Sequence, residues 1–417
     1  MPVPAPTFEV DPELVRTLLT EDVFEPVEPT TLEQAGLTDA FVEALICKDL
    51  SVNGSARGRT LADNIGLPFN IITRLLEALR TRKLIAHASG VQFNDYSYML
   101  TELGTARAHH MLRECAYVGP APVRLSEYVM SVAAQSIVHE APGRDRLVEA
   151  CKGISVDPRL FRSLGPAINS GGAIFLYGAP GNGKSTLARR ITMCFGQRIW
   201  VPHAIIDGGH VIKFYDSQFH RAVEDLDGKL LRSSSVDRRW IQICRPTVVV
   251  GGELTLDNLE LRHHPETRIC EAPLQLKSNC GCLLIDDFGR QRIAPADLLN
   301  RWIVPLDSHY DYLTLPTGKK IQVPFQQIVI FSTNLEPEDL VDEAFLRRIP
   351  YKIHTGDPTD DEFYFLFQLY CEKFGCEYRK DVVTYLLDTY YRPCRRAKRR
   401  CHARDLLAQV RNHCRYN

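Results

Sequence analysis

Short apolar runs alternate with amphipathic stretches through the middle of the chain, and this order predicts an α/β fold. Residues 173–177 form an apolar run typical of a strand, and residues 185–190 begin a helical pattern shortly after it. Two further runs, residues 282–287 and 327–334, are largely apolar and end in polar side chains. Because a helix is predicted over 295–306 between them, the alternation favours a parallel sheet flanked by helices.

Residues 37–118 carry a different pattern, which predicts a smaller α+β unit. The predicted elements are helices over 37–50, over 60–66 and from Pro68, a hairpin of residues 84–88 and 96–100, and a helix from Thr101. Helix, helix-turn-helix and β-wing in this order, with the stretches LADNIGLP and YMLTELG, resemble a winged-helix domain.

The sheet-forming region, residues 170–356, is bounded by segments of other composition. Residues 1–36 contain several prolines and eight acidic side chains against one basic side chain, which predicts a flexible arm or a peripheral docking segment. Residues 119–169 are mixed and predict a helical linker. Residues 357–417 predict helices and become increasingly basic toward the C-terminus.

Two hairpins are predicted inside the sheet-forming region. They consist of residues 200–206 with 211–214, and of residues 312–315 with 319–323. Two aromatic residues at the end of the first hairpin, Phe214 and Tyr215, either line a central pore or belong to the core.

Composition adds limits on the class of protein. The chain has 417 residues, of which 45% are hydrophobic, so two or three soluble domains are expected. A formal net charge of −1 gives no overall attraction to nucleic acid or anionic membrane. We find neither an unbroken apolar span nor the layout of a signal peptide, and expect a cytoplasmic protein.

The thirteen cysteines are expected to be reduced thiols. The pairs Cys280 with Cys282 and Cys401 with His402 invite a structural zinc site. Neither pair belongs to the paired C-x-x-C arrangement that such a site uses, and Cys282 begins an apolar run. Reduced thiols therefore remain the preferred interpretation.

A glycine-rich stretch from Gly178 to Ser185 matches the phosphate-loop pattern G-x-x-x-x-G-K-[ST]. The glycines let successive backbone N–H groups point at phosphates, and the following helix adds the positive end of its dipole. Lys184 brings an ammonium group to the β- and γ-phosphates, and the hydroxyl of Ser185 can complete a Mg²⁺ shell. The strand before the loop and the helix after it argue against a chance glycine turn.

Paired carboxylates end the apolar run at residues 282–287. A buried strand would deliver Asp286 to a bound Mg²⁺ and turn Asp287 toward an attacking water molecule. Buried strands seldom end in adjacent acids without a cation nearby. The next run ends in Asn334, which could orient water beside the γ-phosphate.

Three arginines are further candidates for phosphate contacts. Arg347 and Arg348 follow an apolar helix end, and such a pair could neutralise charge on the ATP of a neighbouring subunit. A solvated salt-bridging pair is the alternative. Arg404 lies on a helix otherwise packed by leucines and is a candidate to reach back to the phosphates.

Taken together, the phosphate loop, LLIDD, VIFSTN, DEAFLRRI and ARDLL occur in the order found in AAA+ ATPases. Residues from about 140 to 417 resemble a bacterial-type member with an N-terminal winged helix. The resemblance implies ATP, Mg²⁺, a C-terminal helical lid, and a homo-oligomeric ring, expected to be a hexamer. The hairpin at 312–323 is similar to a pre-sensor-1 insertion, and Gly153 with Ile154 would lie against the adenine.

The resemblance also implies roles for individual residues. The Walker A loop would consist of Gly178, Ala179, Pro180, Gly181, Asn182, Gly183, Lys184, Ser185 and Thr186. Walker B would be Asp286 and Asp287, sensor 1 Asn334, the arginine finger Arg348 or Arg347, and sensor 2 Arg404. The family usually has glutamate where this chain has Asp287, and a side chain shorter by one methylene predicts slow or partner-dependent hydrolysis.

These features predict an ATPase that remodels a protein or nucleoprotein client. A DNA-binding regulator or loader, in which ATP controls assembly, is the second hypothesis, and a small-molecule P-loop kinase is the third. The arginine pair, the lid and the winged helix argue against the kinase.

Nucleic acid could be contacted at two places. One is the helix that begins at Pro68, with the cations Arg74, Arg80, Arg82 and Lys83. The other is the basic segment 392–415, for which a docking face or a solvated helix end are the alternatives. Residues 37–118 contain nine basic and eight acidic side chains, a weak electrostatic footprint for a stand-alone DNA-binding domain.

Overall fold

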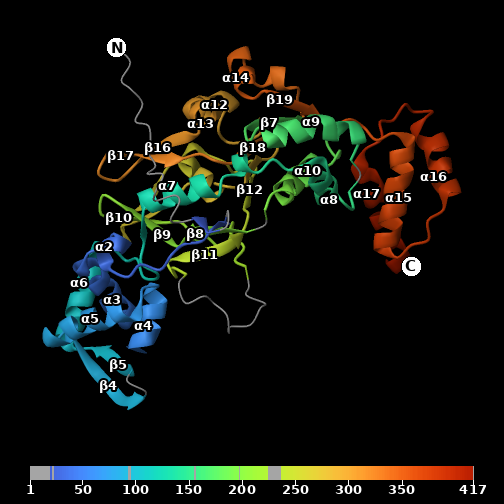
Figure 1. Ribbon diagram of the computed structural model, residues 1–417. Coiled ribbons are helices and arrows are strands. Elements are labelled where there is room, and N and C mark those ends of the chain that lie inside the picture. The colour runs from blue at the N-terminus through green and yellow to red at the C-terminus, as the bar shows by residue number, and fades with distance from the viewer. Residues whose placement is uncertain are drawn as a thin grey trace, which may run out of the picture.

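The computed structural model describes residues 19–20, 23–92, 95–154, 156–196, 198–223 and 236–416 (Figure 1). Most of the predicted acidic arm, residues 1–36, lies outside these ranges. The described part of it holds β1 (Leu19–Thr20), β2 (Val23–Phe24) and α2 (Leu32–Ala35). Within the described ranges, no helix is long and apolar enough to cross a bilayer.

Five parallel strands form the central sheet, three of which (β7, β15 and β18) correspond to predicted apolar runs. The strands are β7 (Ala173–Tyr177), β12 (Thr247–Val250), β15 (Cys282–Ile285), β18 (Ile328–Thr333) and β19 (Tyr351–His354). Their order across the sheet is β12-β15-β18-β7-β19, and each neighbouring pair is parallel. All residues of β15 and β18 are buried because the sheet is covered on both faces.

Successive residues of β7 enter the two layers that cover the sheet. Ile174 and Leu176 pack on one face and Phe175 on the other, the period of two expected of a strand. The first layer contains α8 (Arg144–Ala150), α9 (Pro158–Asn169) and α10 (Lys184–Ile191). The second contains α12 (Pro295–Arg301), α13 (Ile303–Ser308) and α14 (Glu343–Arg348), which lie at the top of Figure 1.

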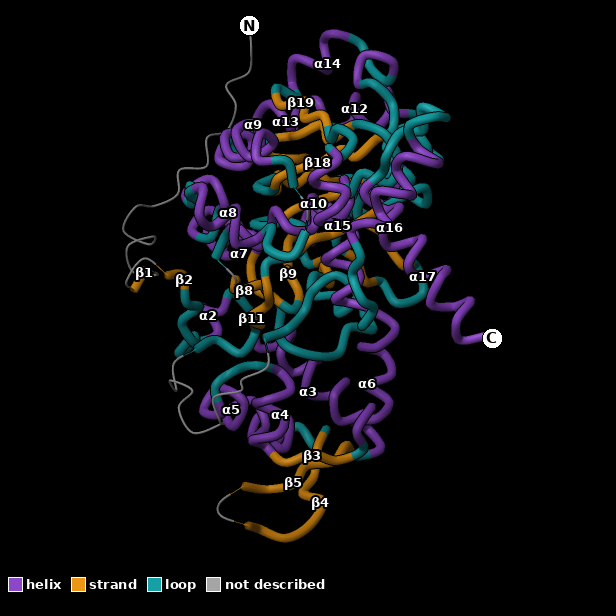
Figure 2. Tube along the Cα trace, turned by 90° about the vertical axis from the view of Figure 1, so that its right-hand side faces the viewer, coloured by secondary structure: helices purple, strands orange, loops and turns teal. Residues whose placement is uncertain are grey.

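The N-terminal unit consists of helices and a three-stranded antiparallel sheet in the order β3-β5-β4. Its elements are α3 (Asp39–Asn53), β3 (Ser55–Arg57), α4 (Gly58–Ile65), α5 (Phe69–Thr81), β4 (Ile85–Gln92), β5 (Asp95–Leu100) and α6 (Glu102–Glu114). The hairpin of β4 and β5 projects from the foot of the molecule in Figure 2.

A second β-rich body lies between this unit and the parallel sheet. Its larger sheet has the order β13-β14-β10-β9-β6, and a separate antiparallel pair joins β8 to β11. The strands are β6 (Val123–Arg124), β8 (Arg198–Pro202), β9 (Ala204–Asp207), β10 (His210–Lys213), β11 (Trp240–Cys244), β13 (Arg262–His264) and β14 (Ile269–Glu271). Helix α7 (Leu125–Ala134) packs against it.

The first predicted hairpin is therefore wrong in part. The run 200–206 forms two strands instead of one, because β8 pairs with β11 whereas β9 pairs with β10. Phe214 is 1% exposed and stacks on His220 at 5.7 Å between ring centroids, so this aromatic belongs to the core and lines no pore. Tyr215 is half-buried beside the same core.

The second predicted hairpin is present as β16 (Tyr310–Thr314) and β17 (Lys320–Pro324). It packs on the β-rich body, and Leu313 and Val323 share a core with Ile205. Lys319 beside its turn forms an ion pair of 2.8 Å with Asp207 at the β9–β10 turn.

The C-terminal region has a small core of its own. It contains α15 (Asp360–Phe374), α16 (Lys380–Leu386), the π-helical turn η5 (Leu387–Tyr391) and α17 (Arg400–Tyr416). The other short helices are η1 (Ile137–His139), η2 (Thr192–Cys194), η3 (Leu256–Leu259), α11 (Leu274–Lys277) and η4 (Pro337–Asp339). The C-terminal helices stand at one end of the molecule, opposite the N-terminal unit (Figure 1).

A buried arginine fastens α2, whose Leu32 and Ala35 pack in the core of the N-terminal unit, to the β-rich body. Arg239 is 2% exposed, and its guanidinium forms two hydrogen bonds of 3.0 and 2.8 Å with one carboxylate oxygen of Asp237. The same group donates to the carbonyl of Ala35 at 2.9 Å and pairs with Glu127 at 3.3 Å. One side chain therefore joins α2, α7 and the strand β11.

Replacing Arg239 with alanine should lower the free energy of unfolding by about 3–5 kcal/mol, because it leaves buried carboxylates without a partner. Chemical denaturation followed by tryptophan fluorescence measures the change. Arg379→Ala serves as the control: it removes an exposed ion pair with Asp381 and should cost less than about 1 kcal/mol. A similarly small loss in Arg239→Ala would show that the buried cluster does not hold the two parts together.

Candidate functional site

The loop between β7 and α10 is a backbone cradle that requires glycine. Gly178, Gly181 and Gly183 have φ angles of 135°, 82° and 83°, in the left-handed region that other residues rarely adopt. A β-carbon on Gly178 would lie 2.6 Å from the carbonyl oxygen of Thr355, and one on Gly181 2.5 Å from the sulfur of Cys401. The loop is thus packed between the end of β19 and the start of α17.

Lys184 at the start of α10 lies inside this cradle. Its ammonium donates to the carbonyls of Gly178 at 2.8 Å and Ala179 at 3.1 Å, and to Oδ1 of Asn334 at 2.7 Å. Burial lowers the pKa of Lys184 below its ordinary value, while Asp286 and Asp287 act in the opposite direction. The cation is therefore held at the base of the loop with acids close by.

Two acids and an amide from neighbouring strands meet the loop. Oγ of Ser185 donates to Oδ1 of Asp286 at 2.9 Å, and Nδ2 of Asn334 donates to Oδ1 of Asp287 at 3.2 Å. Asp287 is exposed and has a φ of 50°, a conformation that aspartate tolerates better than most residues. Because β7, β15 and β18 are parallel neighbours, their carboxyl ends bring these side chains to one edge.

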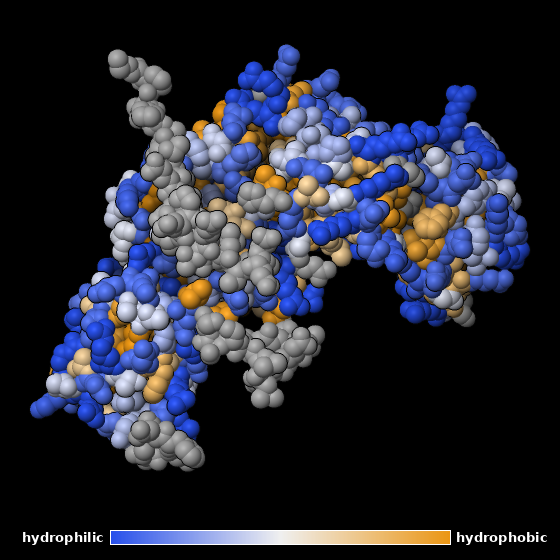
Figure 3. Space-filling model, viewed as in Figure 1, coloured by the Kyte–Doolittle hydropathy of each residue, from blue (hydrophilic) through white to orange (hydrophobic). Residues whose placement is uncertain are grey.

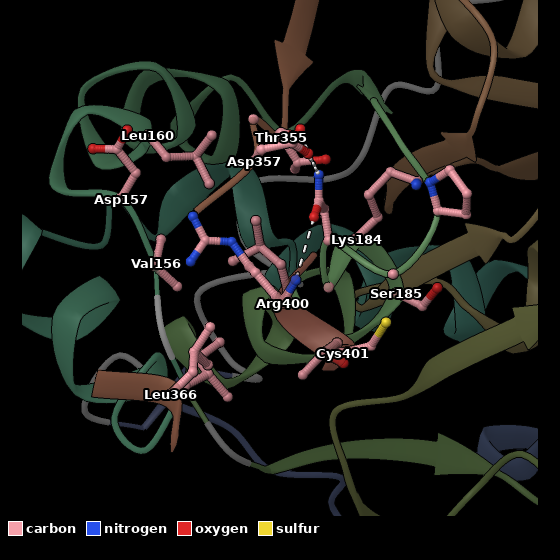
Figure 4. A pocket seen from close by; sticks show the side chains of 18 of the residues that line it. Val156, Asp157, Leu160, Lys184, Ser185, Thr355, Asp357, Leu366, Arg400 and Cys401 are labelled. Carbon is pink, nitrogen blue, oxygen red and sulfur yellow. Dashed lines mark hydrogen bonds between the residues drawn. The ribbon is translucent and has the colours of Figure 1, made fainter. Parts of the chain in front are cut away.

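A cavity of about 340 Å³ opens beside these groups, a size typical of small-molecule sites (Figure 4). Its polar end is formed by the loop from Pro180 onward with Asp286, Asp287 and Asn334. Its apolar end is lined by Ile154, Val156, Leu160, Leu366, Leu369 and Tyr370. The expected contact residue Ile154 lines the cavity, whereas Gly153 does not.

The C-terminal helices supply two arginines to the cavity, and the sequence indicated only one. Arg404 lines the cavity and pairs with Asp405 at 2.8 Å. Arg400 lines it as well, pairs with Glu362 at 3.1 Å, and its side chain points toward Val156 and Leu160 in Figure 4. The spacing of four residues, which places both on one face of α17, was the signal that could have identified Arg400.

The predicted finger residues lie away from this cavity. Both are at the end of α14, at the top of Figure 1. Arg348 is largely buried and its Nε pairs with Asp307 at 2.8 Å. Arg347 is exposed and borders a shallow hollow with Glu343, Leu346 and Lys352. Neither arginine reaches the site of its own chain.

Four of the nine basic side chains in the C-terminal segment 392–415 pair with acids that precede it. Its ion pairs are Arg392 with Asp360 and Asp388, Lys398 with Asp360, Arg399 with Asp357, and Arg400 with Glu362. These acids precede residue 392, so a count of charged residues in 392–415 does not include them. These pairs therefore lower the net positive charge of the segment, and this end of the molecule still has a mostly hydrophilic surface in the view of Figure 3.

Cations on and just after α5 are paired in the same way. Arg74 pairs with Asp39 at 2.8 Å, and Arg82 with Glu43. Arg80 lies 3.0 Å from a ring nitrogen of His87. Partners on α3 thus reduce the positive charge that this helix would present to a phosphate backbone.

The cysteine pairs considered for zinc have other surroundings. Cys280 and Cys282 are buried, and burial raises the pKa of each thiol to about 12. His402 lies 2.8 Å from the hydroxyl of Tyr391 through Nδ1. In the part of the chain that the structure describes, no three histidine, cysteine, aspartate or glutamate side chains are grouped to hold a metal ion.

Comparison with known proteins gives limited matches. A family model described as a domain of unknown function (DUF8689) matches residues 359–417, the region of α15 to α17. A search of curated proteins finds no significant match. Two crystal structures of NtrX from Brucella abortus, one of them with ADP, are 13% and 14% identical, with a TM-score of 0.34 each.

The NtrX matches cover 57% and 59% of this chain and 46% and 48% of the NtrX chains, less than half of their length. A reconstruction of the complex between subunits BchI and BchD of magnesium chelatase is 18% identical, with a TM-score of 0.34. It covers 59% of this chain and 72% of the other. Likenesses of this size carry no argument about activity, which has to rest on the site itself.

Thiol reactivity tests the assignment of the cysteines. In the native protein the exposed Cys394 and Cys414 should react rapidly with a thiol reagent, whereas Cys280 and Cys282 should react only after unfolding. Mass spectrometry of alkylated peptides, with and without denaturant, measures this difference. Rapid labelling of Cys280 or Cys282 in the folded protein would contradict their burial, and co-purified zinc would revive the metal hypothesis.

Proposed function

We propose that this protein is an ATPase of the AAA+ type that binds ATP with Mg²⁺ at the glycine loop. The observation that carries the proposal is the convergence of Lys184, Ser185, Asp286, Asp287 and Asn334 at one end of a cavity. The apolar end of the cavity suits the adenine base of a nucleotide, and the glycine loop suits its phosphates. The five-stranded parallel sheet between helices supports the same class.

The chain's own residues suit phosphate transfer to water. Ser185 and Asp286, whose oxygens lie 2.9 Å apart, are a fitting oxygen donor pair for Mg²⁺, which supplies charge neutralisation at the phosphates when bound. Asp287 acts as the general base, and Asn334 fixes its carboxylate by the hydrogen bond of 3.2 Å. Arg400 and Arg404 approach from the C-terminal helices, which act as the lid.

We further propose that the active form is a ring, a hexamer in the simplest case, in which α14 of one subunit completes the site of the next. The exposed side chain of Arg347 supports this residue as the finger more than Arg348, which is engaged with Asp307. Both arginines of α14 lie away from the site of their own chain, which supports an assembly in which hydrolysis depends on a neighbour.

The client is proposed to be a protein. The element order α3-β3-α4-α5-β4-β5 supports a winged-helix assignment for the N-terminal unit. Pairing of Arg74 and Arg82 with acids of α3 favours protein contacts over DNA contacts for that unit. The DNA-binding regulator remains the alternative, and salt-dependent DNA binding by the full chain would favour it.

Two substitutions separate binding from turnover. Lys184→Ala should weaken ATP binding by at least about 100-fold, because it removes the cation at the phosphates. Asp287→Asn should leave binding intact and lower the hydrolysis rate by about 100-fold or more, because it removes the base. Calorimetric titration with ATP and an assay of phosphate release measure the two effects.

The matched controls are Lys152→Ala and Asp297→Asn, which change exposed residues. Both should bind and hydrolyse ATP as the unmodified protein does. Full phosphate release by Asp287→Asn would exclude it as the base. Formation of ADP that requires an added small-molecule acceptor and releases no inorganic phosphate would instead support the kinase hypothesis.

Mixing two inactive variants tests the neighbour's contribution. Arg347→Ala should bind ATP normally but hydrolyse it about 1000-fold more slowly in the assembled protein. Adding Lys184→Ala subunits, which keep Arg347, should restore part of the activity because they supply the finger to intact nucleotide sites. If Arg348→Ala is inactive while Arg347→Ala is active, Arg348 is the finger. If both variants are fully active, α14 does not supply the finger.

A further inference from the structure

One amide side chain in the glycine loop connects three other segments of the chain. Asn182 is 3% exposed, and its Nδ2 donates to Oδ1 of Asp357 at 2.7 Å and to the carbonyl of Thr355 at 3.3 Å. Its Oδ1 accepts from the backbone N–H of Arg400 at 3.4 Å. The pattern G-x-x-x-x-G-K-[ST] leaves this position open, so the loop motif itself does not require asparagine.

The start of α17 is fastened to the same loop by its backbone. The N–H of Cys401 donates to the carbonyl of Gly181 at 2.9 Å. Arg399, directly before the helix, pairs with Asp357, the acid that Asn182 also contacts. Burial acts to raise the pKa of Asp357, but hydrogen bonds from Asn182 and Arg399 outweigh it and the pKa lies below its ordinary value. The acid is therefore charged at neutral pH and holds both partners.

The contacts of Lys184 indicate why this connection would respond to ligand. In the structure its ammonium bonds to the carbonyls of Gly178 and Ala179, which belong to the loop that also holds Asn182. Phosphate oxygens at the loop would compete for that ammonium. A change in the loop's hydrogen bonds can therefore reach Asp357 and α17 through the buried side chain of Asn182, beside the backbone bond from Cys401 to Gly181.

We propose that Asn182, Asp357 and Arg399 form a latch that holds the C-terminal helices closed over the cavity, and that Asn182 is its positioning residue. The part that concerns nucleotide rests on the proposed function. The latch sets how long nucleotide stays bound, because Arg400 and Arg404 line the cavity from the helix that the latch fixes. The role of the Asn182 side chain is to position Arg400 and Arg404, and it does not contact the phosphates.

Hydrogen exchange on the nucleotide-free full-length protein tests the latch without relying on any activity. Asn182→Ala should raise the exchange rate of the backbone amides of Arg400 and Cys401 by about 10-fold, because two or three hydrogen bonds are lost. Amides in the middle of β18 should exchange as before. The matched control is Asp388→Asn, which affects an exposed ion pair with Arg392 in the same region. This variant should leave the exchange of the Arg400 and Cys401 amides and of the β18 amides unchanged.

Nucleotide dissociation provides the second measurement. With a fluorescent ATP analogue and Mg²⁺, Asn182→Ala should dissociate about 10-fold faster with little change in the association rate. Asp357→Ala should have the same effect, and the double variant should be no worse than either single variant, because both break one latch. Asp357→Asn keeps an oxygen acceptor for Asn182, so its dissociation rate should rise less than that of Asp357→Ala.

The two proposals fail in distinguishable ways. If the analogue does not bind to the unmodified protein, the proposed function is wrong, and the exchange measurement still decides on the latch. Unchanged exchange of Arg400 and Cys401 in Asn182→Ala overturns the latch, as do multiplicative effects of the two alanine variants on dissociation. A lowered unfolding midpoint with unchanged exchange at α17 would assign Asn182 a structural role only.

Discussion

The parallel arrangement of β7, β15 and β18 is the constraint on which the site depends. Parallel strands end at the same edge, so a glycine loop after one and polar residues after the next two must meet there. The result is an ammonium within 3.1 Å of three oxygens, with a hydroxyl–carboxylate pair and an amide–carboxylate pair beside it. These groups come from segments more than 100 residues apart, as Lys184 and Asn334 illustrate.

The rest of the chain is attached to this edge at two ends. On one side the C-terminal helices close over the cavity and are joined to the loop through Asn182 and the backbone of Cys401. On the other side the N-terminal unit is fixed to the β-rich body through Arg239. The hairpin β16–β17 packs on that body and directly precedes β18 in the chain, so the strand that leads to Asn334 is also connected to the body.

Much of the fold and the site could be predicted from the sequence because the signals were local. The apolar runs gave three strands of the parallel sheet, β7, β15 and β18, but not β12 or β19. The loop pattern gave Lys184 and Ser185. Their neighbours Asp286 and Asn334 followed from their place at strand ends. The remainder depends on pairing between distant residues: the run 200–206 divides because its halves have different partners, and Ile212 pairs with Cys270 far along the chain.

The charge of the C-terminal segment likewise depends on distant residues. The segment 392–415 is basic when counted alone, but its partners Asp357, Asp360 and Glu362 lie on another element. Arg400 was overlooked although it lies four residues before Arg404, because several other basic residues surround it in the same stretch. The packing of α17 on the glycine loop then shows which of these residues line the cavity.

An experimental structure of the protein with a non-hydrolysable ATP analogue and Mg²⁺ tests the central claim most directly. The account predicts that the phosphates lie in the loop beside Lys184 and that Ser185 and Asp286 hold the metal ion. It also predicts that the adenine base lies between residues 154–160 and α15. A nucleotide bound elsewhere, or a cavity that stays empty at saturating analogue, would contradict it.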